Sequence, residues 1–146
     1  MSNIKNRKDG FTIIEVLIVL AIAGLIMLIV FLAVPALQRN SRNTQRKNDV
    51  ANILGAVNEF TNNNGGTLPA AASDFTGNAK LGYYSTSDVT YVTSGTAGTT
   101  TSTVYIVKGA KCTNATTTPA TGSSRQFAAW YYVETSSGTM GQCQEG

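Results

Sequence analysis

The sequence contains no histidine, only two cysteines, and few charged residues, which make up 13 % of its 146 positions. Histidine is the commonest general base and metal ligand, so its absence removes the usual basis of both kinds of site. No glycine-rich phosphate-binding motif precedes a lysine. The acids of the C-terminal half lack the spacing of a metal-binding loop: Asp74, Asp88, Glu134 and Glu145. The composition therefore predicts no enzyme, no metal site and no cofactor.

The formal net charge of +3 comes largely from one end of the chain. Of the eleven basic and eight acidic residues, three basic and one acidic residue precede Phe11, a local sum of +2, and the other eight and seven leave +1. The three basic residues are Lys5, Arg7 and Lys8. Nucleic-acid binding usually needs a basic face on the folded domain. A nucleic-acid partner is compatible with this charge, but nothing in the sequence supports one.

The residues divide into an apolar and a polar part. Almost every residue from Phe11 to Val34 is apolar, whereas the chain after Asn62 is mostly Thr, Ser, Gly and Ala. A helix of that apolar length spans about 36 Å, enough to cross a hydrocarbon core of about 30 Å. The chain is therefore predicted to be associated with a membrane.

The stretch between these parts is predicted to continue as a helix. Gln38–Asp49 is polar on every face, and it fits either a solvated linker or a surface that pairs with neighbouring chains. The run Asn62–Gly66 ends the helix, because Asn and Gly accept the left-handed conformation of a helix C-terminus. Before it, apolar residues recur at the helical period: Val50, Ile53, Leu54, Val57 and Phe60.

The rest of the chain is predicted to form short strands. Asp88–Thr93, Thr103–Lys108 and Gln126–Glu134 are rich in β-branched and aromatic residues, and turn-forming clusters separate them. We expect an antiparallel meander of three to four strands, with the Val50–Phe60 stripe on its apolar face and the aromatic side chains packed in the sheet. Thr93–Thr103 is expected to form an exposed hairpin loop. The predicted fold class is α+β, one long helix on a small antiparallel sheet.

The two cysteines, Cys112 and Cys143, lie in the polar part of a membrane-targeted chain. This position favours one disulfide formed outside the cytoplasm, with two unrelated buried thiols as the alternative. Closing a loop of about thirty residues would stabilise so small a domain by about 3–4 kcal/mol on the chain-entropy model.

One acid, Glu15, interrupts the apolar run near its start. A carboxylate near a bilayer centre costs about 2.5–3.5 kcal/mol, and less at the interface, so such residues are functional candidates. The run is too long for a cleaved secretory signal, and the only small residue at its boundary is Gly10, on the N-terminal side. Cleavage after Gly10 would create an amino group on Phe11, which Glu15 of a neighbouring chain could neutralise. The alternatives are an uncleaved single-span anchor and a Glu15 that reaches the headgroups.

The sequence from Gly10 to Glu15 (GFTIIE), with the apolar run behind it, resembles the class III signal of type IV pilins and their pseudopilin relatives. The resemblance implies a prepilin peptidase that cuts between Gly10 and Phe11 and methylates the new Phe11 amine, and a Glu15 that guides assembly. It implies a pilin-like fold and a single-pass precursor in the inner (cytoplasmic) membrane. A pilus assembly machinery would then polymerise the chain with copies of itself into an extracellular helical filament at the cell surface.

Four segments follow from this resemblance: a cleaved basic leader (1–10), a transmembrane and filament-core helix (11–37), a polar then amphipathic helix extension (38–63) and a β-rich head with a disulfide loop (64–146). In related filaments the core helix partly unwinds between a glycine and a proline, and Gly24 and Pro35 are the counterparts here. Pro35 lies a few residues further from the cut than the proline of the best-known bacterial pilins.

The function that the resemblance implies is that of a structural subunit, a major pilin, of a type IV pilus. A minor pilin or a competence or type II secretion pseudopilin is the alternative within the family. A single-pass membrane-anchored extracellular binding module is the alternative from another class. Motility, adhesion, host contact and DNA uptake all use this scaffold, and the sequence does not choose among them.

Overall fold

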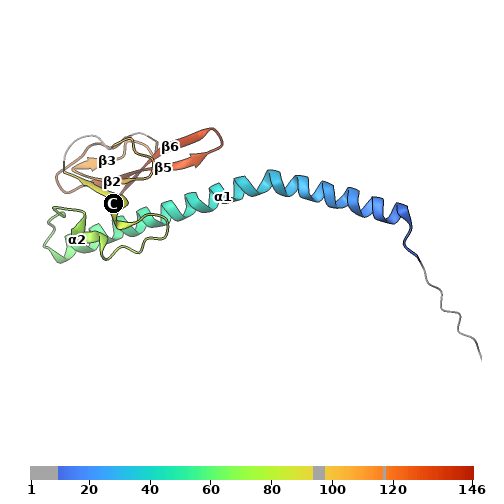
Figure 1. The fold of residues 1–146 in the computed structure, drawn as a ribbon. Coiled ribbons are helices and arrows are strands. Elements are labelled where there is room, and N and C mark those ends of the chain that lie inside the picture. Colours follow the sequence, from blue (N-terminus) through green and yellow to red (C-terminus); the bar gives the residue numbers. More distant parts are fainter. Residues whose placement is uncertain (1–9, 94–97, 117) are drawn as a thin grey trace, which may run out of the picture. The chain divides into compact units, whose positions relative to one another are not determined.

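The computed structural model describes residues 10–93, 98–116 and 118–146, which form two compact units, one ending at Leu37 and one running from Gln38 to Gly146. The expected leader residues Lys5, Arg7 and Lys8 lie outside the described residues. One helix, α1 (Ile13–Asn63), crosses the boundary between the units. The second unit adds a short helix α2 (Ser73–Thr76), a 3-10 turn η1 (Thr86–Asp88) and six strands (Figure 1).

Helix α1 ends where the sequence predicts. The amide of Asn64 donates to the carbonyl of Phe60 at 3.0 Å, and that of Gly66 donates to Thr61 at 2.8 Å. Gly65 and Gly66 have φ angles of 64° and 85°, the left-handed region that glycine enters without a steric penalty. The asparagine and glycine run therefore closes the helix by wrapping the chain back over its last carbonyls.

The main sheet has four strands in the order β1 (Val89–Val92), β2 (Val104–Lys108), β5 (Phe127–Thr135) and β6 (Gly138–Glu145). The pairs β2–β5 and β5–β6 are antiparallel, but β1 and β2 run parallel, in a register that places Val89 opposite Val104. The expected all-antiparallel meander is therefore wrong at its first pair.

The expected hairpin loop at Thr93–Thr103 is wrong for the same reason. Parallel neighbours cannot be joined by a tight turn and need a longer connection that returns to the start of the next strand. This stretch, which contains residues 94–97 outside the described part, is longer than a tight turn requires. Its length therefore indicates a connection that returns to the start of the next strand. The α+β class itself, a long helix packed on a small sheet, is confirmed.

Strand β6 is an edge strand that sequence patterns did not delimit. Its residues (GTMGQCQE) include only one β-branched residue and no aromatic residue, so its propensity for strand is weak. Pairing along its whole length with β5 holds it in the sheet, from Ala128 opposite Glu145 to Thr135 opposite Gly138. A separate two-stranded sheet pairs β3 (Ala110–Lys111) with β4 (Ala120–Thr121).

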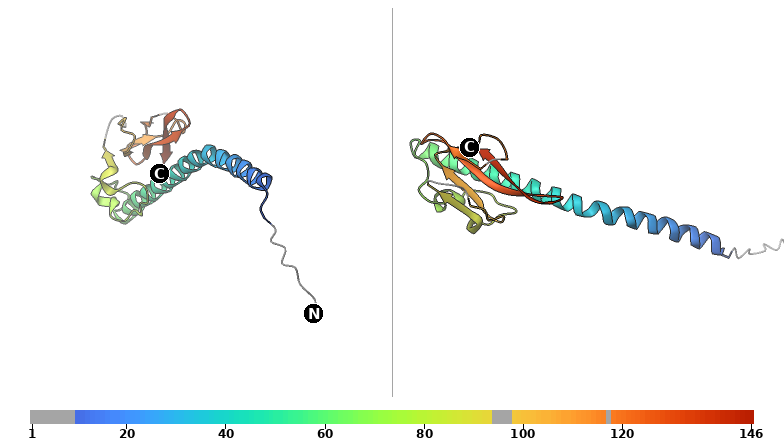
Figure 2. Two further views of the ribbon diagram at one scale, coloured as in Figure 1. Left: turned by 45° about the vertical axis from the view of Figure 1, so that its right-hand side comes forward. Right: turned by 90° about the horizontal axis from the view of Figure 1, so that it is seen from above.

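The part of α1 that belongs to the second unit lies along one face of the main sheet, and the views in Figure 2 agree on this. The predicted apolar stripe is confirmed, because Val50, Ile53, Leu54 and Val57 are at most 4 % exposed, while Phe60 is half-buried. They pack with sheet residues that include Val104, Ile106, Ala129 and Tyr131. The opposite face of the sheet carries a second cluster around Tyr105, Trp130 and Cys143.

Candidate functional site

Gly10 and Phe11 precede α1 in an irregular, exposed stretch. The Phe11 side chain is 86 % exposed. A Cβ added to Gly10 would meet no atom within 4 Å, and its φ angle is not in the left-handed region. Nothing in the chain's own described packing requires glycine here, so a requirement for Gly10 would have to come from a molecule that acts on this peptide bond.

The first turn of α1 is closed by a pair of side chains, Thr12 and Glu15. The Glu15 Oε2 atom accepts hydrogen bonds from the backbone amide of Thr12 at 2.8 Å and from its hydroxyl at 2.7 Å. The backbone amide of Glu15 donates to Thr12 Oγ1 at 3.4 Å. This reciprocal arrangement is a capping box, in which an N-cap threonine and a glutamate three residues later satisfy amides that the helix leaves unpaired. Thr12 was not singled out from the sequence, although its T-x-x-E spacing is the signature of this motif.

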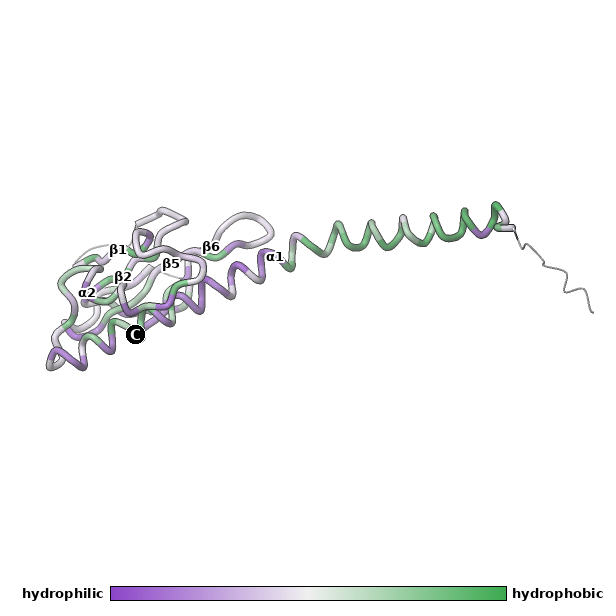
Figure 3. Tube along the Cα trace, turned by 60° about the horizontal axis from the view of Figure 1, so that its bottom comes forward, coloured by the Kyte–Doolittle hydropathy of each residue, from purple (hydrophilic) through white to green (hydrophobic). Residues whose placement is uncertain are grey.

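Helix α1 then presents an apolar surface on all sides up to Leu37, the green part of the tube in Figure 3. Its large apolar side chains up to Leu37 are between 38 % and 82 % exposed. By length and composition, α1 is the one helix in the described chain that could cross a membrane. A helix that is apolar on every side needs lipid or other apolar helices around it.

Gly24 and Pro35 both lie inside α1, which is continuous from Ile13 to Asn63. A Cβ added at Gly24 would meet nothing within 4 Å, so no close approach within the chain requires glycine there. Pro35 has no amide hydrogen and cannot bond to the carbonyl of Phe31. The isolated chain therefore accommodates both residues in a helix, and each lowers the local stability of that helix.

The polar block Gln38–Asp49 pairs with the head of its own chain, an arrangement that neither sequence interpretation included. Arg42 holds the Glu134 carboxylate with two atoms, Nε to Oε1 at 2.9 Å and Nη2 to Oε2 at 2.5 Å. Arg46 holds the same carboxylate at 3.0 Å. The hydrogen bonds from Arg42 lower the pKa of Glu134, and that carboxylate in turn raises the pKa of Arg42. We call Arg42, Asn43, Arg46 and Glu134 the head clamp.

The head clamp also covers backbone groups of strand β5. Strand β2 pairs with β5 only as far as Trp130, so beyond that point one edge of β5 lacks a neighbouring strand. There Arg46 Nη1 donates to the carbonyl of Tyr132 at 3.0 Å, and Asn43 bonds both the amide and the carbonyl of Glu134. Side chains of α1 thus replace a missing strand, which protects an edge that could otherwise pair with another chain.

Two further contacts bury polar groups of the same helix. Asp49, which is 3 % exposed, accepts backbone hydrogen bonds from Gly82, Tyr83 and Tyr84 at 2.7–2.8 Å. Arg46 donates to the hydroxyl of Tyr83, and its guanidinium carbon lies 4.4 Å from the centre of that ring. The helix and the loop before η1 are therefore fixed to each other by charge-assisted hydrogen bonds.

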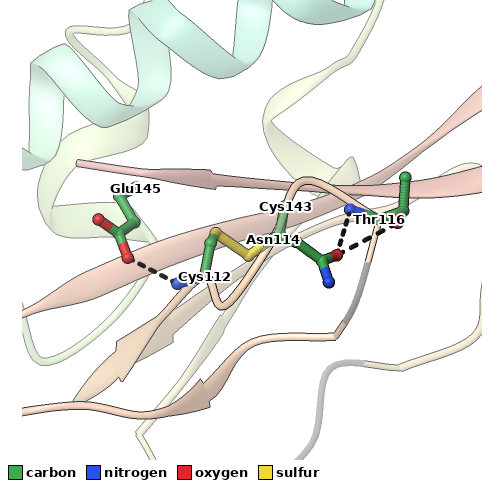
Figure 4. Close-up of a disulfide and its surroundings, with 5 residues drawn as sticks. All are labelled: Cys112, Asn114, Thr116, Cys143 and Glu145. Atoms are coloured by element: carbon green, nitrogen blue, oxygen red, sulfur yellow. Dashed lines mark hydrogen bonds between the residues drawn. A yellow bond between two sulfur atoms is a disulfide. The ribbon is translucent and has the colours of Figure 1, made fainter.

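Cys112 and Cys143 form a disulfide, with their Cα atoms 5.7 Å apart and a sequence separation of 31 (Figure 4). The backbone amide of Cys112 also donates to Glu145 Oε1 at 2.7 Å. In the same segment, Asn114 Oδ1 accepts from the amide and hydroxyl of Thr116, at 3.1 and 3.2 Å. The disulfide therefore ties the segment after β3 to the last strand of the main sheet.

The remaining aromatic residues pack inside the head. Tyr84, Tyr105, Trp130 and Tyr131 are at most 9 % exposed. Burial raises the pKa of Tyr84 to about 12 and also raises that of Tyr131. No cluster of three or more His, Cys, Asp or Glu side chains that could hold a metal ion occurs within the described ranges. Among these candidate residues, the structure places Thr12 in hydrogen-bond contact with Glu15 and joins Cys112 to Cys143.

A family model for the prokaryotic N-terminal methylation motif matches residues 5–31. The matched segment contains Gly10, Phe11 and Glu15, and also Thr12 and Gly24. No curated protein and no solved structure matches the chain. Residues 5–31 are therefore the prokaryotic N-terminal methylation motif, the class III signal of type IV pilins and pseudopilins.

Proposed function

We propose that the chain is the precursor of a structural subunit, a major pilin, of a type IV pilus. A prepilin peptidase cleaves it between Gly10 and Phe11 and methylates the Phe11 amine. The mature chain is stored in the membrane and polymerises through residues 11–37. The observation that carries this proposal is the acid Glu15, which lies at the start of an exposed apolar helix, four residues after Phe11 and inside the matched methylation motif.

The exposed apolar helix supplies the driving force for such a cycle. Burial of a leucine-sized side chain is worth roughly 1.5–3 kcal/mol relative to water. Release of the mature chain into water is therefore prohibitive, because every apolar residue of 11–37 would be exposed at once. Transfer from lipid into a bundle of identical helices keeps those side chains covered, so an assembly machinery can move subunits in either direction at small net cost.

Glu15 gives the bundle its register. Its Oε2 atom is occupied by Thr12 of the same chain, while Oε1 has no hydrogen-bond partner among the described residues. After cleavage Phe11 carries an ammonium group, and a carboxylate with one oxygen still open can bind such a group on a neighbouring helix. A charge pair of this kind is strong only in a low-dielectric bundle, and only when the two helices are aligned along their axes.

Gly24 and Pro35 give the same helix its flexibility. We propose that the segment between them loosens when the subunit enters the filament. The missing hydrogen bond at Pro35 and the low helix propensity of Gly24 make this stretch the easiest part of α1 to extend. The head clamp lies after this segment and keeps the rest of α1 attached to the sheet.

Intact-mass measurement of the chain extracted from its own cells tests the processing step. The expected product begins at Phe11, lacks residues 1–10 and carries one additional methyl group. Gly10→Val should block cleavage without altering the fold, because a Cβ added at this exposed position would meet no atom of the described chain within 4 Å. A wild-type chain that retains Met1 would falsify the proposal and favour a membrane-anchored extracellular binding module.

Filament formation tests the role of the acid. Glu15→Gln should leave the chain stable in the membrane and reduce the yield of sheared surface filaments severalfold. Glu59→Gln is the matched control, since Glu59 is an exposed residue of the same helix within the head unit. Normal filaments from the Glu15 variant would contradict the account of assembly.

Abundance in those filaments separates the alternatives within the family. A major pilin is the main component of the sheared material. A minor pilin or a pseudopilin is scarce there, although its deletion changes the number of filaments or a secretion or uptake activity.

A further inference from the structure

We propose that the outer end of the α1 span is a binding site for an anionic phospholipid, whose phosphate is held by Arg39 with Arg42 beside it. The inference rests on the proposed function, which places residues 11–37 in a membrane before assembly. The new element is a partner for the subunit while it is stored in the membrane, a lipid headgroup of negative charge. The supporting observations are the position of these arginines along the helix and the local surplus of positive charge.

The position follows from the geometry of one continuous helix. Residues 16–37 contain no charged residue, and α1 continues without a break through Arg39 and Arg42. Arg39 and Arg42 are the second and fifth residues after Leu37, and at 1.5 Å per residue this corresponds to about 3 Å and about 7.5 Å of helix length. The headgroup region on each side of a bilayer is about 5–8 Å thick. With residues 11–37 in a bilayer, this short length of helix keeps both arginines within reach of the lipid phosphates.

The charges in this layer are not balanced within the chain. Arg42 and Arg46 share the single carboxylate of Glu134, and Asp49 is buried against backbone amides. Across the described residues, no ion pair involves Arg39 or Lys47. Four positive charges (39, 42, 46 and 47) against two negative ones (49 and 134) leave a local sum of +2.

Arg39 is the residue best suited to hold a phosphate. Its side chain is half-buried, so part of its freedom is already restricted, yet its charge has no carboxylate in contact. A guanidinium presents two parallel N–H groups that match two phosphate oxygens. The Arg42 side chain is 41 % exposed even when paired with Glu134, so its remaining face is accessible to the same lipid.

The surplus of positive charge after Leu37 lies on the side of the membrane where such residues are less common. Positive residues near a span are normally concentrated on the cytoplasmic side. This chain carries four of them within ten residues of Leu37, on the side that is translocated together with the head. Basic residues next to a membrane gain about 1 kcal/mol each from anionic lipid. Glu134 also attracts Arg39 but is in contact with Arg42 and Arg46, so a phospholipid phosphate is the counter-charge that can contact Arg39 directly while the subunit waits in the bilayer.

Native mass spectrometry of the full chain, as extracted from its membrane into micelles, tests the proposal. The probes are phosphatidylglycerol, which is anionic, and phosphatidylcholine, which has the same phosphate but no net charge. We expect the wild-type chain to bind phosphatidylglycerol more tightly. Arg39→Gln should reduce that preference about fivefold, the equivalent of about 1 kcal/mol for one basic residue.

Arg125→Gln is the matched control. It removes the same charge from an exposed residue of the head that is far from the span in sequence. The control should keep the wild-type preference within about twofold. Equal binding of the two lipids by the wild-type chain, or the same reduction in both variants, would overturn the proposal.

Two further measurements keep the result unambiguous. Increasing the ionic strength should weaken the wild-type preference, and an unchanged preference would contradict an electrostatic site even if the Arg39 variant failed to fold. The mass of the same sample reports whether residues 1–10 are absent. An uncleaved chain refutes the proposed function, whereas a cleaved chain without lipid preference refutes only the lipid site.

Discussion

Asn43 and Glu134, 91 residues apart in sequence, exchange two hydrogen bonds in the way that neighbouring strands do. The Asn43 amide nitrogen donates to the Glu134 carbonyl at 2.7 Å, and the Glu134 backbone amide donates to Asn43 Oδ1 at 2.8 Å. A side chain of the helix thus continues the hydrogen-bond pattern of the sheet beyond the end of β2. Since the carboxylate of Glu134 also holds two arginines of the helix, this one residue joins α1 to the sheet through both its backbone and its side chain.

Removal of the Asn43 amide should therefore weaken the head. Asn43→Ala leaves the amide and carbonyl of Glu134 without partners in a half-buried position, and we expect a loss of about 1–3 kcal/mol in the free energy of unfolding. Denaturant titration of the full chain in micelles, followed by the fluorescence of Trp130, measures it. Asn58→Ala, an exposed change on the same helix, should have an effect within about 0.5 kcal/mol. Equal effects of the two substitutions would show that the paired hydrogen bonds do not stabilise the head.

The head should lose stability in acid, partly through Glu134. The hydrogen bond from Arg42 lowers the pKa of the folded Glu134, so its charge stabilises the fold above the unfolded pKa. That contribution is lost as the pH falls below about 4.3 and through the lower folded value. Glu134→Gln should thus be less stable at neutral pH and should show a shallower decline on acidification. Hydrogen bonds also lower the pKa values of Asp74 and Asp88, so part of the decline should persist.

Measuring stability against pH for two arginine variants identifies which arginine lowers the pKa of Glu134. Arg42→Gln removes the group that lowers the Glu134 pKa most, while Arg46 and Arg39 still lower it, so the decline of this variant should also become shallower. Arg125→Gln should retain the wild-type decline. If all three variants retain it, the acid sensitivity arises elsewhere in the head.

The sequence predicted those features that depend on local patterns. The motif from Gly10 to Glu15, the apolar stripe from Val50 and the glycine-rich end of α1 all have a physical signature within a few residues. The head clamp has no such signature. Arg42 and Glu134 lie 92 residues apart, and only the pairing of β5 with β6 beyond the end of β2 brings an open strand edge to the helix.

Parallel pairing of β1 and β2 could not be derived from propensity either. Both strands consist mostly of β-branched residues with one aromatic residue each, a composition that suits either direction of pairing. Strand β6 could not be recognised from its residues, because its pairing with β5, and not its own strand propensity, holds it in the sheet. Thr12, by contrast, has a local signature, because its T-x-x-E spacing to Glu15 is that of a capping box.

Gly141 should be intolerant of any side chain. It lies in β6 beneath the indole of Trp130, and a Cβ at this position would collide with that ring. Gly141→Ala should cost about 1–3 kcal/mol, because the ring must leave its place in the buried cluster around Tyr105 and Cys143. Urea denaturation and the emission wavelength of Trp130 report the change.

A second glycine provides the opposite control. Gly55 lies on the exposed side of α1, and an added Cβ would meet nothing within 4 Å. Gly55→Ala should stabilise the head by about 0.5–1 kcal/mol through higher helix propensity. A loss of stability at Gly55, or none at Gly141, would contradict the packing described for these two positions.

Loss of the disulfide should destabilise the head without changing its sheet. Closing a loop with a sequence separation of 31 corresponds to about 3–4 kcal/mol on the chain-entropy model. The double variant Cys112→Ser with Cys143→Ser should therefore unfold at much lower denaturant concentration. Trp130 lies opposite Cys143 in the strand register, so its fluorescence is a direct probe of this region. A variant as stable as the oxidised wild type would show that the disulfide adds nothing to the fold.

The capping box should govern how firmly the first turn of α1 is closed. Thr12→Val keeps the shape of the side chain but removes the hydroxyl that bonds to Glu15. Loss of an N-cap costs about 1 kcal/mol, so amides of the first turn should exchange with deuterium roughly fivefold faster in micelles. Thr12→Ser retains the hydroxyl and should exchange at the wild-type rate. Equal exchange rates in the Thr12→Val and Thr12→Ser variants would show that the Thr12 hydroxyl does not stabilise the helix end. The Glu15 carboxylate would then be positioned by its bond to the Thr12 backbone amide alone.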